Sequence, residues 1–175
     1  MERILIVVDI QNDFVDCSLG TKEAQEIIEP DCEKIKSFDG HIFVTLDTHG
    51  ENYLETAEGR KLPVEHCIKG TAGWGLNALV AEALSDRAYT PVEKLTFGSV
   101  ELPRLIAKSA GDEAFAVELV GLCTDICVVS NALILKASFP EMEVSVSASC
   151  CAGVTPESHK AALSVMKMCQ INVTE

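Results

Sequence analysis

The sequence has few positive charges, few aromatic side chains and no long hydrophobic run. Only 14 Lys and Arg residues stand against 27 Asp and Glu residues, so the formal net charge is -13 at pH 7. Nucleic acids and anionic membranes are bound mainly through clusters of Lys and Arg, so this balance argues against both as partners. The longest apolar runs, such as Ile4–Val8, are far too short to cross a bilayer.

A secretory signal and a disulfide framework are also missing. Asp9 interrupts the first apolar segment, and no small-residue cleavage site follows it, so we expect a cytoplasmic protein. None of the eight cysteines forms a CxxC pair. A chain of 175 residues can build its core without covalent staples. We therefore expect reduced thiols and no zinc cage made of thiolates.

The chain has the length and composition of one folded domain that covers residues 1–175, with 47% apolar residues. Hydrophobic periodicity predicts strands at residues 3–10, 41–48, 88–95, 114–122, 143–149 and 171–174. It predicts helices at residues 21–38, with an interruption near Pro30, and at 76–84, 101–110, 125–139 and 156–169. This alternation is typical of the α/β class, here a three-layer α/β/α fold around a six-stranded, mainly parallel sheet.

In open parallel sheets, ligands bind beyond the carboxyl ends of the strands. The polar residues at those ends are Asp9, Asp47, His49 and Lys94, together with the turn "GLCTDIC" at residues 121–127. Periodicity does not fix the strand order. In a 3-2-1-4-5-6 order, the ends of strands one, three and four would meet only if the loop after strand three reached inward.

Three of these positions supply a complementary set of groups. Asp9 follows a buried strand and must be solvated, paired or hydrogen-bonded, and capping of the next turn is one way to achieve this. Lys94 alone would be read as a surface charge, and Cys127 alone as a buried cysteine at a helix start. Brought together, the three residues provide a base, a cation and a nucleophile.

Cys127 is expected to lie near the start of a helix. Thr124 and Asp125 are typical of a helix N-terminus, and Thr124 is a candidate cap. Because the helix dipole and Lys94 would both stabilise a thiolate, we expect the pKa of Cys127 to lie below that of a free cysteine.

The segments "DIQNDF", "EKLTFGS" and "GLCTDICV" resemble, in order and spacing, the three signatures of the nicotinamidase and isochorismatase-like cysteine hydrolases. The resemblance runs from Arg3 to about His159. It implies an isochorismatase-like hydrolase fold in which Asp9, Lys94 and Cys127 form a catalytic triad.

The same resemblance implies the environment of the triad. It places a cis peptide bond between Leu122 and Cys123, and it directs the backbone N–H groups of Cys123 and Cys127 at a developing oxyanion. Cys123 then fills a small-residue position, and Phe14 lines the substrate pocket.

A second cluster of possible ligands lies in the polar loop of residues 50–75 and just before it. Asp47 and His49 are two residues apart, and Glu55, Glu58 and His66 follow. Imidazoles and carboxylates together can coordinate Zn²⁺, Fe²⁺ or Mn²⁺. In the alternative interpretation, Asp47 caps a turn and both histidines are exposed or hydrogen-bonded loop residues.

The spacing in this loop resembles the D-x-H and P-x-H-C elements of metal-dependent nicotinamidases, in which the ion binds the pyridine nitrogen of the substrate. Their third ligand is often a histidine between these elements, but none lies between His49 and His66. Glu58 is the expected replacement, and Glu55 is the alternative. The resemblance places Leu62 in the wall of the substrate pocket, at a position where this group commonly has tryptophan.

The resemblance implies an amidohydrolase that cleaves the C–N bond of a small amide, with nicotinamide converted to nicotinate and ammonia as the leading reaction. A divalent metal would be its cofactor, with no organic cofactor, and a homodimer or homotetramer its assembly. One alternative is a metal-independent relative that acts on a carbamoyl or ureido compound or on a vinyl ether. Another is an inactive binding scaffold with the same fold.

Overall fold

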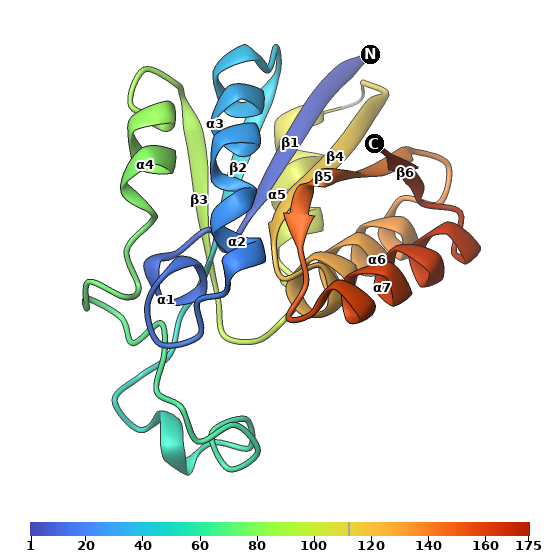
Figure 1. Cartoon of the computed structure of the whole chain (residues 1–175). Helices are drawn as coiled ribbons and strands as arrows, with labels where there is room; N and C mark the ends of the chain where they lie inside the picture. The colour runs from blue at the N-terminus through green and yellow to red at the C-terminus, as the bar shows by residue number, and fades with distance from the viewer. Residues whose placement is uncertain (112) are drawn as a thin grey trace.

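The computed structural model describes residues 1–111 and 113–175 (Figure 1). Its strands are β1 (Glu2–Val8), β2 (His41–Asp47), β3 (Tyr89–Lys94), β4 (Phe115–Leu122), β5 (Glu143–Ala152) and β6 (Asn172–Thr174). Its helices are α1 (Asn12–Val15), α2 (Lys22–Glu26), α3 (Ile28–Ser37), α4 (Ala78–Leu84), α5 (Leu102–Ala110), α6 (Val129–Ser138) and α7 (Pro156–Met168). Two short turns complete the order, a 3₁₀ turn η1 (Tyr53–Glu55) and a π-helical turn η2 (Thr124–Val128).

The six strands form a single sheet in the order β3-β2-β1-β4-β5-β6, and each neighbouring pair is parallel. The predicted α/β class with a six-stranded sheet is confirmed. The chain first moves outward from β1 to β3 and then crosses back to β4 on the other side of β1. This reversal opens a crevice at the carboxyl ends of β1 and β4, where ligands of such sheets bind.

Strand β1 lies at the centre of the sheet and has apolar side chains on both faces. Ile4, Ile6 and Val8 pack into the core beneath α5, α6 and α7. Leu5 and Val7 pack into the opposite core, which includes side chains of α2, α3 and α4. Because both faces are covered, the strand sequence is continuously hydrophobic, as expected for a buried parallel strand.

Gly121 allows β4 to approach β1 closely near the crevice. Its φ is +112°, and a Cβ atom there would lie 2.2 Å from the carbonyl oxygen of Val8. Any larger residue would push apart the two strand ends that carry the site. The position therefore requires glycine.

Two local expectations from the sequence are wrong, and a third is confirmed. The interruption expected near Pro30 falls at Ile27, between α2 and α3, and Pro30 itself lies in the first turn of α3. Proline is tolerated there because the first N–H groups of a helix have no partner within it. Strand β5 continues to Ala152 and so includes Cys150 and Cys151. The helix expected from residue 125 begins as the π-helical turn η2.

Among residues 1–111 and 113–175, no helix combines the length and the hydropathy that a membrane span requires.

Asp31 on α3 is a buried acid outside the crevice. Its side chain is 0% exposed, and neither carboxyl oxygen has a hydrogen-bond partner among the described residues. Burial raises the pKa of Asp31 well above its usual range, and nearby Cys150 and Lys34 offset only part of this effect. The folded state therefore favours the neutral carboxylic acid.

Asp31→Asn should stabilise the protein increasingly as the pH rises. The pKa of Asp31 is higher in the folded state than in the unfolded state. The native protein therefore loses stability as the pH rises from the unfolded value toward the folded one, and Asn avoids this loss. We expect no advantage near pH 4 and about 1–3 kcal/mol at pH 8, measured by urea unfolding. The exposed Asp39→Asn is the matched control, and a pH-independent difference would contradict the prediction.

Candidate functional site

Four ionisable side chains lie in a row at the carboxyl edge of the sheet. Asp9 directly follows β1, Asp47 ends β2, Lys94 ends β3, and Cys127 lies in η2 after β4. All four side chains are buried. The fold thus brings together residues from four separate strand ends, as the sequence predicts for the triad positions.

The Lys94 ammonium joins this row. Its Nζ lies 2.6 Å from Oδ2 of Asp9, 3.1 Å from Oδ1 of Asp47 and 3.5 Å from Sγ of Cys127. The loop after strand three reaches inward, as expected from the sequence: Nζ of Lys94 donates to the carbonyl oxygen of Thr96 at 3.0 Å, and Phe97 lines the cavity beside Cys127. Burial alone would lower the pKa of Lys94, but Asp9, Cys127 and Asp47 raise it above its usual range.

Asp9 retains a free acceptor site. Its Oδ1 accepts a hydrogen bond from Oγ1 of Thr45 at 2.7 Å, whereas Oδ2 has only the ion pair with Lys94 and no hydrogen bond of good geometry. Burial raises the pKa of Asp9, although Lys94 offsets part of the effect. A carboxylate with a raised pKa is the stronger base, and Oδ2 can accept a further proton.

Cys127 does not have the lowered pKa expected from the sequence. Burial raises its pKa well above the usual value, the Asp9 carboxylate raises it further, and Lys94 reverses only part of this rise. The expectation considered the helix start and the cation but not the desolvation of a side chain that is only 5% exposed. The thiol is therefore protonated at neutral pH in the free protein.

Thr124 does not cap a helix, because η2 has no side-chain cap. Its hydroxyl is instead 2.8 Å from Nδ1 of His159 on α7. The next residue, Asp125, accepts a hydrogen bond from the backbone N–H of Val154 at 3.1 Å. These two contacts fix η2, the nucleophile turn of the mechanism proposed below, to α7 and to the segment that leads into it. A partner 35 residues away in sequence is not visible from local patterns.

The backbone around Cys127 is fixed from both sides. The peptide bond between Leu122 and Cys123 is cis, at the position where the resemblance places such a bond. Burial raises the pKa of Cys123 to about 12, so this thiol stays neutral. On the other side, Nδ2 of Asn131 donates to the carbonyl oxygen of Cys127 at 2.8 Å, and its Oδ1 accepts from Ser99 N–H at 2.9 Å. Sequence reasoning missed Asn131, although its i+4 spacing from Cys127 was a signal.

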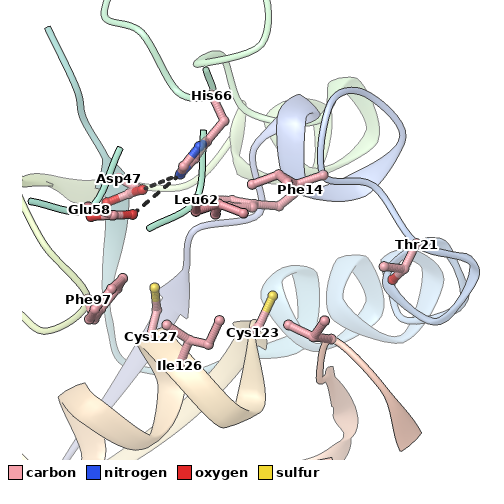
Figure 2. Close-up of a pocket in the computed structure, with 12 residues that line it drawn as sticks. Phe14, Thr21, Asp47, Glu58, Leu62, His66, Phe97, Cys123, Ile126 and Cys127 are labelled. Atoms are coloured by element: carbon pink, nitrogen blue, oxygen red, sulfur yellow. Dashed lines mark ion pairs between the residues drawn. The ribbon is translucent and has the colours of Figure 1, made fainter. Parts of the chain in front are cut away.

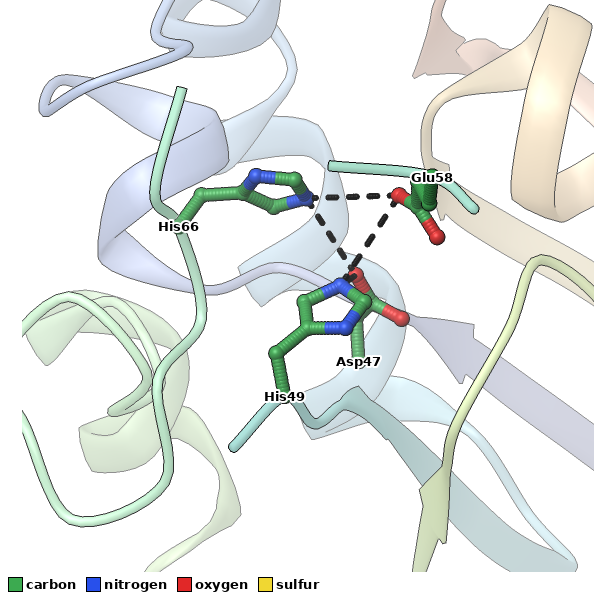
Figure 3. Close-up of side chains that lie close together, drawn as sticks. All are labelled: Asp47, His49, Glu58 and His66. Carbon is green, nitrogen blue, oxygen red and sulfur yellow. Dashed lines mark hydrogen bonds and ion pairs between the residues drawn. The ribbon is translucent and has the colours of Figure 1, made fainter. Parts of the chain in front are cut away.

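The second cluster is assembled as expected, with Glu58 and not Glu55. Ligand atoms of Asp47, His49, Glu58 and His66 all lie within 4.8 Å of one another (Figure 3). Nε2 of His49 is 2.9 Å from Oδ2 of Asp47 and 3.8 Å from Oε1 of Glu58. Nε2 of His66 is 3.6 and 3.7 Å from the same two oxygens. Glu55 is exposed and lies outside the cluster.

These four residues fit a divalent ion. Ligands that each lie about 2.0–2.2 Å from one ion are separated from one another by roughly 3–4 Å, which matches the cluster. Nδ1 of His66 donates to the carbonyl oxygen of Val64 at 2.8 Å, so its Nε2 directs a lone pair inward. Burial would raise the pKa of Asp47, but the neighbouring His49, His66 and Lys94 lower it overall. Asp47 is therefore charged, and its carboxylate could serve as an oxygen ligand.

Tyr53 packs against both imidazoles and was not identified from the sequence. Its ring centroid lies 4.8 Å from that of His49 and 4.9 Å from that of His66. Its hydroxyl donates to the carbonyl oxygen of Leu62 at 2.9 Å. Burial raises its pKa to about 12, so the phenol is neutral. Tyr53 orients the two histidines without competing as a ligand.

Residues 11–13, which follow Asp9, hold the loop of residues 48–77 in place. This loop carries His49, Glu58 and His66 and is called the metal loop below. Oε1 of Gln11 accepts from the N–H of Asp47 at 2.7 Å, and its Nε2 donates to the carbonyl oxygens of Asp47 and Trp74 at 2.9 and 2.8 Å. Oδ2 of Asp13 accepts from Cys67 N–H at 2.8 Å. Part of the motif "DIQNDF" thus fixes the loop, a role that only its distant partners reveal.

A cavity of about 260 Å³ opens onto Cys127 (Figure 2). Cys127 and Cys123 lie on one side of it, and the carboxylates of Asp47 and Glu58 and the imidazole of His66 lie on the other. Phe14 and Leu62 line it, where the sequence places them. Its remaining apolar walls, which sequence reasoning missed, are Leu19, Phe97, Ile126 and Val154.

Comparison with known proteins places this site in a family. The isochorismatase domain model matches residues 3–175. The chain belongs to the isochorismatase family. It is thus an isochorismatase-family hydrolase, and the resemblance seen in its motifs is confirmed.

Individual relatives are similar over most of their length. An uncharacterised isochorismatase-family protein of Bacillus subtilis (strain 168) is 29% identical over 143 residues, which cover 76% of this chain and 78% of that protein. The pyrazinamidase of Pyrococcus horikoshii in complex with zinc has a TM-score of 0.84 at 26% identity, covering 100% of this chain and 99% of that one. The nicotinamidase/pyrazinamidase of Bacillus subtilis has the same TM-score at 24% identity over the whole of both chains, which shows the fold. The four-residue cluster is like the zinc site of pyrazinamidase homologues.

Asp9→Asn should make Cys127 react faster with iodoacetamide at pH 7.5, by severalfold, because it removes a negative charge that raises the thiol pKa. Lys94→Met should slow the same reaction, because it removes the cation that lowers this pKa. The rates would be measured by mass spectrometry in a background of Cys17→Ser and Cys169→Ser, since both of those thiols are exposed. Slower labelling in a folded Asp9→Asn protein would show that Asp9 does not suppress the thiolate.

Glu58→Gln should weaken Zn²⁺ binding at least tenfold, because it replaces a charged ligand with a neutral one. Glu55→Gln makes the same chemical change three residues earlier and should leave affinity unchanged. Competition with a chromogenic chelator would measure both affinities. Equal weakening by the two substitutions would exclude Glu58 as the specific ligand.

Proposed function

We propose that this protein is a cysteine-dependent amidohydrolase that cleaves the C–N bond of a small amide, with nicotinamide converted to nicotinate and ammonia as the leading reaction. The observation that carries the proposal is the Lys94 ammonium, which contacts both Asp9 and Cys127 beside a cavity bordered by the metal cluster. Asp9, Lys94 and Cys127 are the proposed triad.

The reaction begins with a proton transfer. The Cys127 thiol gives its proton to Oδ2 of Asp9, and the sulfur attacks the amide carbonyl carbon. Lys94 stabilises the thiolate as it forms, since its ammonium lies 3.5 Å from the sulfur. The backbone N–H groups of Cys123 and Cys127 are the proposed donors to the oxyanion.

The second half of the reaction restores the thiol. Asp9 returns its proton to the leaving nitrogen, ammonia departs, and a thioester joins the acyl group to Cys127. A water molecule then gives a proton to Asp9 and attacks the thioester, which releases the carboxylic acid. Asp9 finally protonates the thiolate, so the cycle consumes one amide and one water.

The metal cluster supports a substrate with a ring nitrogen. A divalent ion held by Asp47, His49, Glu58 and His66 would offer an electrophilic contact for a pyridine nitrogen. The apolar walls formed by Phe14 and Leu62 suit the faces of a flat ring. A homodimer or homotetramer remains a prediction from the family resemblance.

Purified protein should release ammonia from nicotinamide, and Cys127→Ala should reduce the rate by about 10³-fold or more, because it removes the nucleophile. Cys123→Ala, which alters the other thiol in the same cavity, should retain activity within about tenfold. A chelator should lower the rate, and added Zn²⁺ or Mn²⁺ should restore it. An enzyme-coupled ammonia assay would measure all of these rates.

Other outcomes would separate the alternatives. Turnover of a ureido compound or a vinyl ether that is insensitive to chelator would replace nicotinamide with a substrate that needs no metal. Failure of Cys127 to react with an alkylating agent, together with no turnover of any of these compounds, would indicate an inactive scaffold.

A further inference from the structure

A second cavity adjoins the one that contains Cys127. Its volume is about 510 Å³, roughly twice that of the first. Both cavities share one wall, which consists of Glu58, Leu62, Phe97 and Ile126. Cys127 lines only the first cavity, so the second is next to the reacting sulfur without containing it.

Side chains from two loops make much of this shared wall. Leu62 comes from the metal loop and is 39% exposed, and Phe97 follows β3 and is 43% exposed. Figure 2 shows Phe97 and Ile126 beside Cys127, and Leu62 across the cavity from them, next to Phe14. A partition of exposed side chains can open by rotamer changes alone, without movement of the backbone.

The second cavity has an apolar side and a polar rim. Leu62, Leu95, Phe97 and Ile126 form the apolar side, and Leu95 is 81% exposed. The polar lining consists of Thr56, Thr96 and Lys61, together with His49 and Glu58 of the four-residue cluster. A lysine can cover apolar surface with its aliphatic stem. A group that enters this cavity would therefore gain mainly by burying hydrocarbon.

The position of Asp9 decides which end of a substrate reaches the second cavity. Asp9 returns the proton to the leaving nitrogen, and it is 0% exposed and lines neither cavity. The leaving nitrogen must therefore face the closed end of the site. The acyl group then faces the open side, where the partition lies.

We propose that the second cavity binds an apolar substituent on the acyl group of the substrate. The substrate class is then a primary amide of an aromatic or heteroaromatic acid that carries a hydrocarbon chain. This assignment of the substrate class rests on the proposed amidase function. The shape of the binding site can also be tested without any turnover.

The first test uses N-alkyl iodoacetamides, whose alkyl chain begins four bonds from the alkylated sulfur. The rate of Cys127 labelling should rise from the N-methyl to the N-butyl reagent, by up to about threefold to fourfold for each methylene that enters the cavity. Mass spectrometry would follow the labelling in the Cys17→Ser, Cys169→Ser background.

Variants that fill the second cavity provide the comparison. Ala57→Trp and Lys61→Trp project from different positions that line only this cavity, and each should abolish the effect of chain length. Their rates with iodoacetamide itself should stay unchanged. Val100→Trp adds the same bulk at a residue that is 85% exposed and lines neither cavity, and should preserve the effect. An effect of chain length that survives in both filled variants, or is absent from the native protein, would overturn the proposal.

The second test separates this proposal from the proposed function. Catalytic efficiency should be higher for 5-butylnicotinamide than for nicotinamide, and Ala57→Trp should remove the advantage while nicotinamide turnover continues. If nicotinamide and its alkyl derivatives all fail to react, the nicotinamidase proposal fails, and the labelling series still decides whether the cavity binds a chain. If nicotinamide reacts and the alkyl chain gives no advantage, the amidase stands and the second cavity is not a substrate site.

Discussion

The buried ammonium of Lys94 is the interaction on which the site depends. A buried cation is tolerated only beside compensating charges, and here Asp9 and Asp47 both lie within 3.1 Å of it. The reverse also holds, because two buried carboxylates at neighbouring strand ends would repel each other without this cation. The ion pairs of Lys94 with Asp9 and Asp47 therefore hold the ends of β1, β2 and β3 together. Cys127 meets this group from the other side of the crevice, which requires the close approach of β4 to β1 at Gly121.

Asp47 makes the thiol site and the metal cluster a single electrostatic unit. One carboxyl oxygen faces Lys94, and the other faces His49 and His66. A cation bound at the cluster would therefore weaken the attraction between the Asp47 carboxylate and Lys94, although the two sites lie in different sequence motifs. Burial sets the direction of the pKa shifts of Cys127 and Asp9. It keeps the Cys127 thiol protonated and makes Asp9 a stronger base.

Much of this arrangement could be predicted from the sequence, because strand periodicity and the rule for parallel sheets place ligands at strand ends. The strand-end rule identified Asp9 and Lys94 as candidate site residues. The family resemblance identified Glu58 as a candidate metal ligand. The predictions failed where the outcome depends on burial or on contacts between residues that are distant in sequence. The pKa of Cys127 depends on desolvation, which no local pattern records. The partner of Thr124 is on α7, and Tyr53 supports histidines that are separated from it by loop residues.

The loop between β2 and α4 extends beyond the carboxyl edge of the sheet and carries His49, Glu58 and His66 (Figure 1). Its only described regular element is the three-residue turn η1, and hydrogen bonds from residues 11–13 hold its returning limb at residues 67–75. The outer part of the loop can therefore change in sequence while those anchors and the sheet remain the same. Substitutions in the outer part of the loop would therefore reshape the cavity wall at Leu62 while the strand ends that carry Asp9, Lys94 and Cys127 keep their positions.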